Sequence, residues 1–292
     1  MAKKKEIESK GVVILAFGKR GYSFAAWNLA KSIKHYSPNL HITLFSQDEC
    51  IKYLDDLTVF DNVEILDQEL CVTDSKLDPA KTKVLMYDFL PYTHNIYIDA
   101  DCILLKDIEP LMDECVNSGK YYLTTVIDKG TKDQDIRYNG WASSDDIWKH
   151  FKVKEGAILP AIQSSWCYLK KCKEADVFAS NLKKYFDFPI KLLKQKWGGG
   201  LPDELIYSGT CANMQLIPEG NDAVFFGNTR ESLTFNEIIE KHYILTLYGS
   251  GSGRATVRLK YREWYDNLMK KINGKVKYKG LYILQDKHVD NK

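Results

Sequence analysis

The sequence predicts an α/β protein with a mixed, mainly parallel central sheet flanked by helices. Two observations carry this prediction. Short apolar segments rich in β-branched residues alternate with segments of helical period, and no long Pro/Gly/Ser linker or internal repeat divides the chain. The 292 residues are 45% hydrophobic and 27% charged with a net charge of +2, which excludes a disordered chain and leaves room for a large core.

The first half shows the alternation most clearly. Residues 11–17, GVVILAF, are short, apolar and β-branched, which is typical of a buried strand. Residues 22–36 space Phe24, Trp27 and Ala30 three apart, which predicts a helix that ends before Pro38. The further expected elements are strands at 40–45, 62–66 and 95–98 and a helix at 79–90.

The second half is less regular. We expect strands at 121–127, 163–169 and 242–248, and helices at 173–186 and 203–213. Glycines and a proline in 197–202 indicate a loop before the last of these helices. Residues 128–148 have weak periodicity and many polar side chains, which predicts a long loop.

Charge is distributed unevenly along the chain. Residues 48–78 carry ten acidic and two basic residues, whereas residues 254–292 carry eleven basic and four acidic, and residues 170–196 eight basic and three acidic. Basic surface favours an anionic ligand such as phosphate, nucleic acid or an acidic glycan, although a solvated lysine-rich surface has the same composition.

The absence of membrane-span, signal-peptide and disulfide patterns indicates the cellular compartment. No apolar run reaches the roughly 18 residues of a membrane span, and no signal-peptide core follows the basic N-terminus. The seven cysteines are scattered without a CxxC pair, which argues against a disulfide framework or a zinc site. We therefore expect a cytoplasmic protein without a membrane span.

The most informative segment delivers two carboxylates at the end of an apolar strand. Asp99 and Asp101 are separated by one residue, so their side chains can converge on one face of an extended chain. Paired carboxylates suit a hard divalent cation, Mn²⁺ or Mg²⁺, with diphosphate oxygens and water completing its ligands. A strand-end turn without any ligand would show the same pattern.

The residues around this pair resemble a known signature. Tyr97-Ile98-Asp99-Ala100-Asp101, with leucines at 104, 105 and 111 and an isoleucine at 108, resembles the GT-A-fold nucleotide-sugar glycosyltransferases, and is most similar to the glycogenin-like family 8. The resemblance implies a GT-A, Rossmann-like domain that binds a sugar nucleotide, most simply a UDP-sugar. It implies that Asp99 and Asp101 bind Mn²⁺ and that Asp99 and Ala100 lie against the donor.

Other donor-binding residues follow from the same resemblance. Lys83 lies where the family has a basic residue near the donor, sixteen residues before Asp99. The segment Ala16-Phe17-Gly18 resembles the family's nucleotide-cradling strand end, and Tyr22 lies where a ring can contact the base. A solvated helix lysine and an exposed helix tyrosine are the alternatives at positions 83 and 22.

Two later segments are candidates for the reacting centre. Gln163-Ser164-Ser165 resembles the family's Asn-Ser-Gly segment near the donor sugar, with Gln for Asn and Ser for Gly. Asp203 and Glu204 resemble its Asp-Gln or Asp-Glu motif, so Asp203 is expected to bind sugar hydroxyls. Glu204 is expected to lie under the anomeric carbon as a charge-stabilising group, nucleophile or base, and the resemblance favours retention of configuration. As an alternative, two acidic residues simply suit the first turn of a helix.

The family's third metal ligand has no clear counterpart. In the family this ligand is the histidine of a late His-x-x-Gly-type motif. When Tyr248-Gly249 is aligned with the aromatic-to-Gly step of that motif, the histidine position falls on Leu247, so His242 is the alternative ligand. The following Gly/Ser run, with Gly251 and then Arg254, suits phosphate through accessible backbone N–H groups and a guanidinium.

Together these features predict a metal-assisted glycosyltransferase acting from a nucleotide-sugar donor on a hydroxyl of a glycan, a protein or a hydroxylated base in DNA. The alternatives are a nucleotidyltransferase of related fold and a nucleic-acid-binding module that uses the basic C-terminal region. We expect a basic tail at 1–10, a catalytic domain at 11–253 and a basic helical extension at 254–292 packed on it. Within the domain, 11–111 is the expected nucleotide-binding half and 112–253 the acceptor and sugar half.

Overall fold

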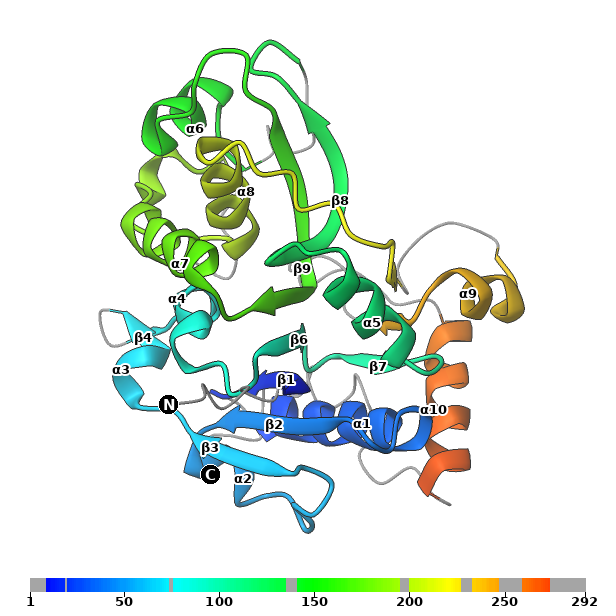
Figure 1. Ribbon diagram of the computed structural model, residues 1–292. Coiled ribbons are helices and arrows are strands. Elements are labelled where there is room, and N and C mark those ends of the chain that lie inside the picture. Colours follow the sequence, from blue (N-terminus) through cyan, green and yellow to red (C-terminus); the bar gives the residue numbers. More distant parts are fainter. Residues whose placement is uncertain are drawn as a thin grey trace, which may run out of the picture.

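The computed structural model describes residues 9–18, 20–73, 76–134, 141–194, 200–226, 233–246 and 259–273. Within these residues the central sheet has six strands in the order β3-β2-β1-β6-β9-β8 (Figure 1). The strands are β1 (Lys10–Ala16), β2 (His41–Ser46), β3 (Asn62–Ile65), β6 (His94–Ile98), β8 (Tyr122–Gly130) and β9 (Leu159–Lys170).

The sheet is mixed and mainly parallel, as the sequence predicts. Strands β3, β2, β1 and β6 pair in parallel, whereas β9 runs antiparallel to β6 and to β8. The chain order reverses between β1 and β6, because β2 and β3 extend the sheet on one side of β1 and β6 lies on the other. In open α/β sheets ligands bind beyond the carboxyl ends of strands at such a reversal.

Helices cover both faces of this sheet, and the alternation of side chains along β1 shows how. Val13 and Leu15 pack into one apolar cluster with residues of α4, α6, α7 and α8, whereas Val12 and Ile14 pack into another with residues of α1 and α5. These helices are α1 (Arg20–Tyr36), α4 (Pro79–Leu85), α5 (Glu109–Asn117), α6 (Ser144–Phe151), α7 (Lys173–Tyr185) and α8 (Asp203–Asn213).

Smaller elements complete the described fold. They are α2 (Asp48–Ile51), α3 (Gln68–Cys71), β4 (Val72–Thr73), β5 (Lys76–Leu77), η1 (Met86–Phe89), β7 (Cys102–Leu104), η3 (Ile190–Leu192), β10 (Val224–Phe226), α9 (Phe235–Lys241), β11 (Ile244–Thr246) and α10 (Leu259–Asn273). Strands β10, β11 and β7 form a second sheet. Among the described residues, no helix is both long and apolar enough to cross a membrane.

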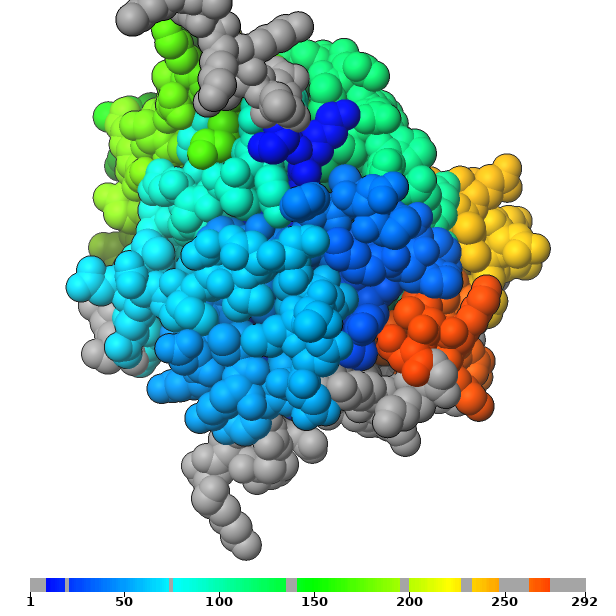
Figure 2. Space-filling model, turned by 60° about the horizontal axis from the view of Figure 1, so that its bottom comes forward, coloured from blue at the N-terminus to red at the C-terminus, as the bar shows by residue number. Residues whose placement is uncertain are grey.

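Helix α10 lies against the second sheet and α1. Its Tyr265, Leu268 and Met269 are buried in a cluster with residues of β7, β10, β11 and α9. The ring of Trp264 stacks on Phe235 of α9 with centroids 4.8 Å apart. Figure 2 shows α10, in orange-red, seated beside the blue N-terminal segment.

The structure corrects three details of the expected elements. The loop expected at 128–148 is wrong in part, because β8 continues to Gly130 and α6 begins at Ser144, where the Ser143 side chain caps the helix. The helix expected at 79–90 ends at Leu85 and continues as the tighter turn η1. Strand β11 covers only the middle of 242–248, and residues 247–248 lie outside the described part.

Candidate active site

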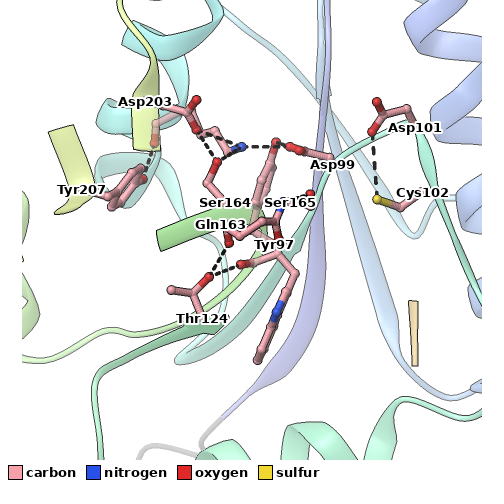
Figure 3. Close-up of polar contacts among 12 residues, drawn as sticks. Tyr97, Asp99, Asp101, Cys102, Thr124, Gln163, Ser164, Ser165, Asp203 and Tyr207 are labelled. Carbon is pink, nitrogen blue, oxygen red and sulfur yellow. Dashed lines mark hydrogen bonds and ion pairs between the residues drawn. The ribbon is translucent and has the colours of Figure 1, made fainter. Parts of the chain in front are cut away.

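A turn at the end of β6 presents the paired carboxylates. The Asp99 N–H donates to the carbonyl of Ser165, 2.8 Å away, and the Cys102 N–H donates to the carbonyl of Asp99, 3.1 Å away. The chain therefore turns over Asp99 and Asp101 before it enters β7. A strand-end turn is present, as one interpretation of the sequence holds. Asp99 belongs to a larger polar cluster, whereas the Asp101 side chain contacts Cys102 Sγ, 3.9 Å away (Figure 3).

Lys83, in the last turn of α4, is the centre of that cluster. Its Nζ lies 3.0 Å from Asp99 Oδ1 and 3.0 Å from Asp203 Oδ2, and it donates to Ser164 Oγ at 3.1 Å. The ammonium also lies 5.0 Å from the centre of the Tyr97 ring. One buried cation thus joins side chains from four separate elements. Lys83 is therefore not the solvated helix lysine that the sequence left open as an alternative.

Ser164 reaches this cluster because β9 bulges. Leu123 pairs with Tyr168 and Thr125 with Gln163, so β9 places more residues than β8 between the same two pairs. Bulges of this kind redirect side chains beside binding sites. The hydroxyl of Ser164 consequently donates to Asp203 Oδ2 at 2.7 Å.

Asp203 is held at the start of α8. Pro202 precedes it, and acidic residues in a first helical turn are favoured by the helix dipole. One turn later, the Tyr207 hydroxyl donates to the backbone carbonyl of Lys83, 2.9 Å away, and so ties α8 to α4. The Tyr97 hydroxyl similarly donates to Asp99 Oδ1.

The electrostatics of the cluster leave excess negative charge. Burial opposes the charge of Lys83, yet Asp203 and Asp99 outweigh it and raise its pKa well above the usual range. Burial, and then the charge of Asp99, raise the pKa of Asp101 to about 7. Burial, and then the charge of Asp203, raise the pKa of Glu204 to about 8. The single positive charge of Lys83 therefore lies among several carboxyl groups and does not neutralise all of them.

A divalent cation fits the Asp99–Asp101 pair on chemical grounds. Both side chains offer hard oxygen ligands. Burial, and then the charge of Asp99, disfavour the ionised form of Asp101 and raise its pKa, and a bound cation would offset both effects. Within the described residues, no group of three or more His, Cys, Asp and Glu side chains is placed to hold a metal. The arrangement suits an ion that takes one or two carboxylates from the protein and its other ligands from phosphate and water.

His242 does not fit the metal-ligand role expected for it. It lies before β11, whose other end pairs Thr246 with Cys102, the neighbour of Asp101. Strand β11 begins at Ile244, which pairs with Leu104, so His242 precedes the end of this strand that lies away from Cys102. Its Nδ1 is instead 2.9 Å from the carbonyl of Asp222, and its ring packs near Phe225.

The other expected donor contacts lie along the same edge of the sheet. Ala16 and Phe17 are buried at the end of β1, and Ala100 is buried in the turn after β6. Gly18 has φ +83°, a backbone conformation that glycine adopts readily, and Tyr22 is 40% exposed in the first turn of α1. Their contacts with a nucleotide stay predictions.

Not every candidate joins the Lys83 cluster. Gln163 donates through Nε2 to the hydroxyl of Ser165, two residues on, while its Oε1 is buried and has no hydrogen-bond partner among the residues that the structure describes. Its catalytic role stays a prediction, and Ser164 is the member of that segment in contact with Lys83. Gly251 and Arg254 lie outside the described residues, as does Leu247.

Sequence reasoning missed two tyrosines. Tyr97 and Tyr207 each donate to a group of the cluster, yet Tyr97 enters the sequence prediction only as part of the Asp99–Asp101 signature and no role is predicted for Tyr207. The only signal for Tyr207 is its position one turn after Asp203, which places it on the same helix face.

Comparison with solved structures identifies the fold. The bifunctional glycosyltransferase WbbM matches with a TM-score of 0.58 and 13% identity over 94% of this chain and 51% of its own, so this chain spans about half of that protein. The galactosyltransferase LgtC, solved with donor and acceptor sugar analogues, matches with a TM-score of 0.53 and 10% identity over 89% of this chain and 96% of its own.

The apo glycosyltransferase GlyE of Streptococcus pneumoniae matches with a TM-score of 0.50 and 14% identity over 90% of this chain and 63% of its own. No protein-family model and no curated protein matches the sequence. At these identities the likeness is one of fold: the chain has a GT-A-like fold, as expected. The narrower likeness to the glycogenin-like family stays a prediction.

Proposed function

We propose that this protein transfers a sugar from a nucleotide-diphosphate donor, a UDP-sugar, to a hydroxyl acceptor. The observation that carries the proposal is the position of Lys83, 3.0 Å from both Asp99 and Asp203 at the carboxyl edge of a GT-A-like sheet. The glycosyltransferases of similar fold support sugar transfer in general, and LgtC was solved with donor and acceptor sugar analogues.

In this proposal Asp99 and Asp101 hold Mn²⁺ or Mg²⁺ together with the donor diphosphate. When bound, the cation would neutralise charge on the leaving nucleoside diphosphate. Lys83 holds Asp99 and Asp203 in place through its ion pairs with both carboxylates. Its ammonium adds a positive charge to that of the proposed cation. Because Asp203 is held by both Lys83 and Ser164, its second carboxylate oxygen is positioned to accept hydrogen bonds from sugar hydroxyls.

Glu204 supplies the proton chemistry. A carboxyl with a pKa of about 8 exchanges its proton near neutral pH, as a general base for an acceptor hydroxyl requires. Once ionised, the same group would stabilise oxocarbenium-like charge at the anomeric carbon. We include retention of configuration in the proposal because the Asp99–Asp101 signature implies it. Retention requires the acceptor hydroxyl to attack the face of the sugar that the nucleoside diphosphate leaves, since base-assisted attack on the opposite face inverts the configuration. NMR of the product anomer tests that point.

Release of the nucleoside diphosphate tests the proposed function. Wild type is incubated with a panel of UDP-sugars, with and without Mn²⁺, in the presence of hydroxyl acceptors. We expect Mn²⁺-dependent release of UDP from at least one donor, and a loss of about a hundredfold in Asp203→Asn. Asp113→Asn is the matched control, because this carboxylate lies on α5 and is 60% exposed.

Two results would overturn the proposal. One is the absence of UDP release from every donor in the presence of Mn²⁺. The other is turnover of nucleoside triphosphates alone with release of pyrophosphate, which would favour the nucleotidyltransferase alternative.

A further inference from the structure

The bulge in β9 is opposed by a single residue of β8. One flanking pair is Leu123 with Tyr168, and the other is Thr125 with Gln163. Between these pairs β8 has only Thr124, whereas β9 has four residues. Thr124 is fully buried, so it contacts the bulge from inside the protein.

The backbone of Thr124 binds a different segment. Its N–H donates to the carbonyl of Pro218 at 2.9 Å, and its carbonyl accepts from the N–H of Gly220 at 2.9 Å. Both main-chain hydrogen-bonding groups of Thr124 are therefore engaged by residues 218–220. The hydrogen bonds between Thr124 and the bulge come from its side chain.

The Thr124 hydroxyl spans the bulge. Its Oγ1 lies 2.9 Å from the carbonyl oxygen of Gln163 and 2.7 Å from that of Trp166 (Figure 3). A threonine hydroxyl has one hydrogen, which it shares between these two acceptors. One buried hydroxyl thus joins the two points between which Ser164 and Ser165 lie.

The segment between these two carbonyls contacts both carboxylate elements of the proposed site. Ser164 Oγ donates to Asp203 Oδ2 at 2.7 Å, and the carbonyl of Ser165 accepts from the Asp99 N–H at 2.8 Å. The Ser165 contact has support of its own, because the next residue, Trp166, pairs with β6. Among the described strand pairs, none includes Ser164. The position of Ser164 beside Asp203 therefore depends on the Thr124 hydroxyl.

We propose that Thr124 is a positioning residue for sugar transfer: its hydroxyl holds the β9 bulge so that Ser164 fixes the carboxylate of Asp203 for the sugar. This inference rests on the proposed function and adds to it a residue that acts only through another, because Thr124 is buried. Its effect should fall on the sugar and not on the nucleotide, since the diphosphate and the metal are assigned to the Asp99–Asp101 turn.

Thr124→Val tests the inference, because valine keeps the branched shape and removes the hydroxyl. With Mn²⁺ and a UDP-sugar that wild type turns over, we expect kcat/KM for UDP release to fall at least about tenfold. UDP itself, measured by calorimetry with Mn²⁺, should bind within about threefold of wild type. Thr124→Ser keeps the hydroxyl, so its kcat/KM should stay within about threefold of wild type.

The matched control is Thr43→Val. Thr43 is buried in β2, and its hydroxyl is hydrogen-bonded to that of Tyr92 at 2.8 Å. The substitution removes a buried hydroxyl from another strand of the same sheet and leaves the bulge intact. We expect kcat/KM to change by less than about twofold.

The route through Ser164 is tested by combining two substitutions. Residues that act through a shared contact have non-additive effects. In Ser164→Ala, which has lost the contact with Asp203, adding Thr124→Val should therefore lower kcat/KM by less than about twofold. A full further tenfold loss would overturn the inference.

Three other results would also overturn it. The first is wild-type kcat/KM in folded Thr124→Val, and the second is a loss of UDP affinity equal to the loss of kcat/KM. The third is a tenfold loss in Thr124→Ser, which decides even if Thr124→Val fails to fold. In each case UDP release by wild type leaves the proposed function standing, whereas a wild type that releases no UDP from any donor overturns both.

Discussion

Lys83 Nζ lies 3.0 Å from Asp203 Oδ2, and this buried ion pair joins the end of α4 to the first turn of α8. The two helices pack on the same face of the sheet, and the pair fixes their polar ends beside the turn that carries Asp99. Stability of this region and its proposed chemistry therefore depend on the same cation.

Replacing Lys83 by Met should destabilise the fold by about 3 kcal/mol, because Asp99 and Asp203 would remain partly buried without their counter-charge. Met retains most of the side-chain volume, so the effect reports charge and not a cavity. Urea denaturation of the free protein at pH 7 measures the change in unfolding free energy.

Lys173→Met is the control for this substitution, because Lys173 is exposed at the start of α7 and should change stability by less than about 0.5 kcal/mol. If the two variants lose similar small amounts, Lys83 is not the cation that holds the cluster together.

Glu204 should make the protein less stable as pH rises. Its pKa is about 8 when folded and near the ordinary 4.5 when unfolded, so between these values the folded state holds one more proton. Stability then falls with pH by up to about 1.4 kcal/mol per unit for this group. Urea denaturation from pH 5 to pH 8 should show a shallower decline in Glu204→Gln than in wild type.

The two stability curves should meet near pH 5, where Glu204 is protonated in the folded state, and diverge in favour of Glu204→Gln towards pH 8. Parallel curves across this range would mean that Glu204 has an ordinary pKa and that its burial does not disfavour the charge.

Asp101→Asn should separate stability from function. At pH 8 the wild-type carboxylate is ionised beside Asp99, so its replacement should stabilise the free protein by at least about 1 kcal/mol. The same change removes a proposed metal ligand, and Mn²⁺-dependent UDP release should fall by about a hundredfold or more. Thermal denaturation and the UDP-release assay are made on the same sample.

An Asp101→Asn protein that keeps full Mn²⁺-dependent release would contradict the ligand role of Asp101. A variant that loses release and also loses stability would show that Asp101 supports the folded turn, and the excess of negative charge inferred for this site would be wrong.

The sequence places the Asp99–Asp101 turn at the correct edge of the sheet because its signal is local. Asp99 and Asp101 follow an apolar strand directly, and the position of a strand end in a parallel sheet defines the edge where ligands bind. The start of α8 is equally local, since Pro202 and two acidic residues mark a helix N-terminus, and the observed helix has the expected bounds.

Ser164 and His242 show what local patterns miss. Ser164 enters the cluster through a bulge, which is a property of how β9 pairs with β8 and is not visible in either strand alone. His242 was the wrong choice because its distance from Asp101 depends on the register of β11 against β7. Long-range pairing of this kind has no sequence signature at a single position.

The central claim, a nucleotide site at the Asp99–Asp101 turn, is tested most directly by thermal denaturation of wild type with UDP, with Mn²⁺ and with both. A ligand that binds only the folded state raises its stability by about 2.7 kcal/mol at a hundred times its dissociation constant. We predict a clear rise in the unfolding temperature with UDP and Mn²⁺ together, and a much smaller rise with either alone. An unfolding temperature unchanged by millimolar UDP and Mn²⁺ would contradict the claim.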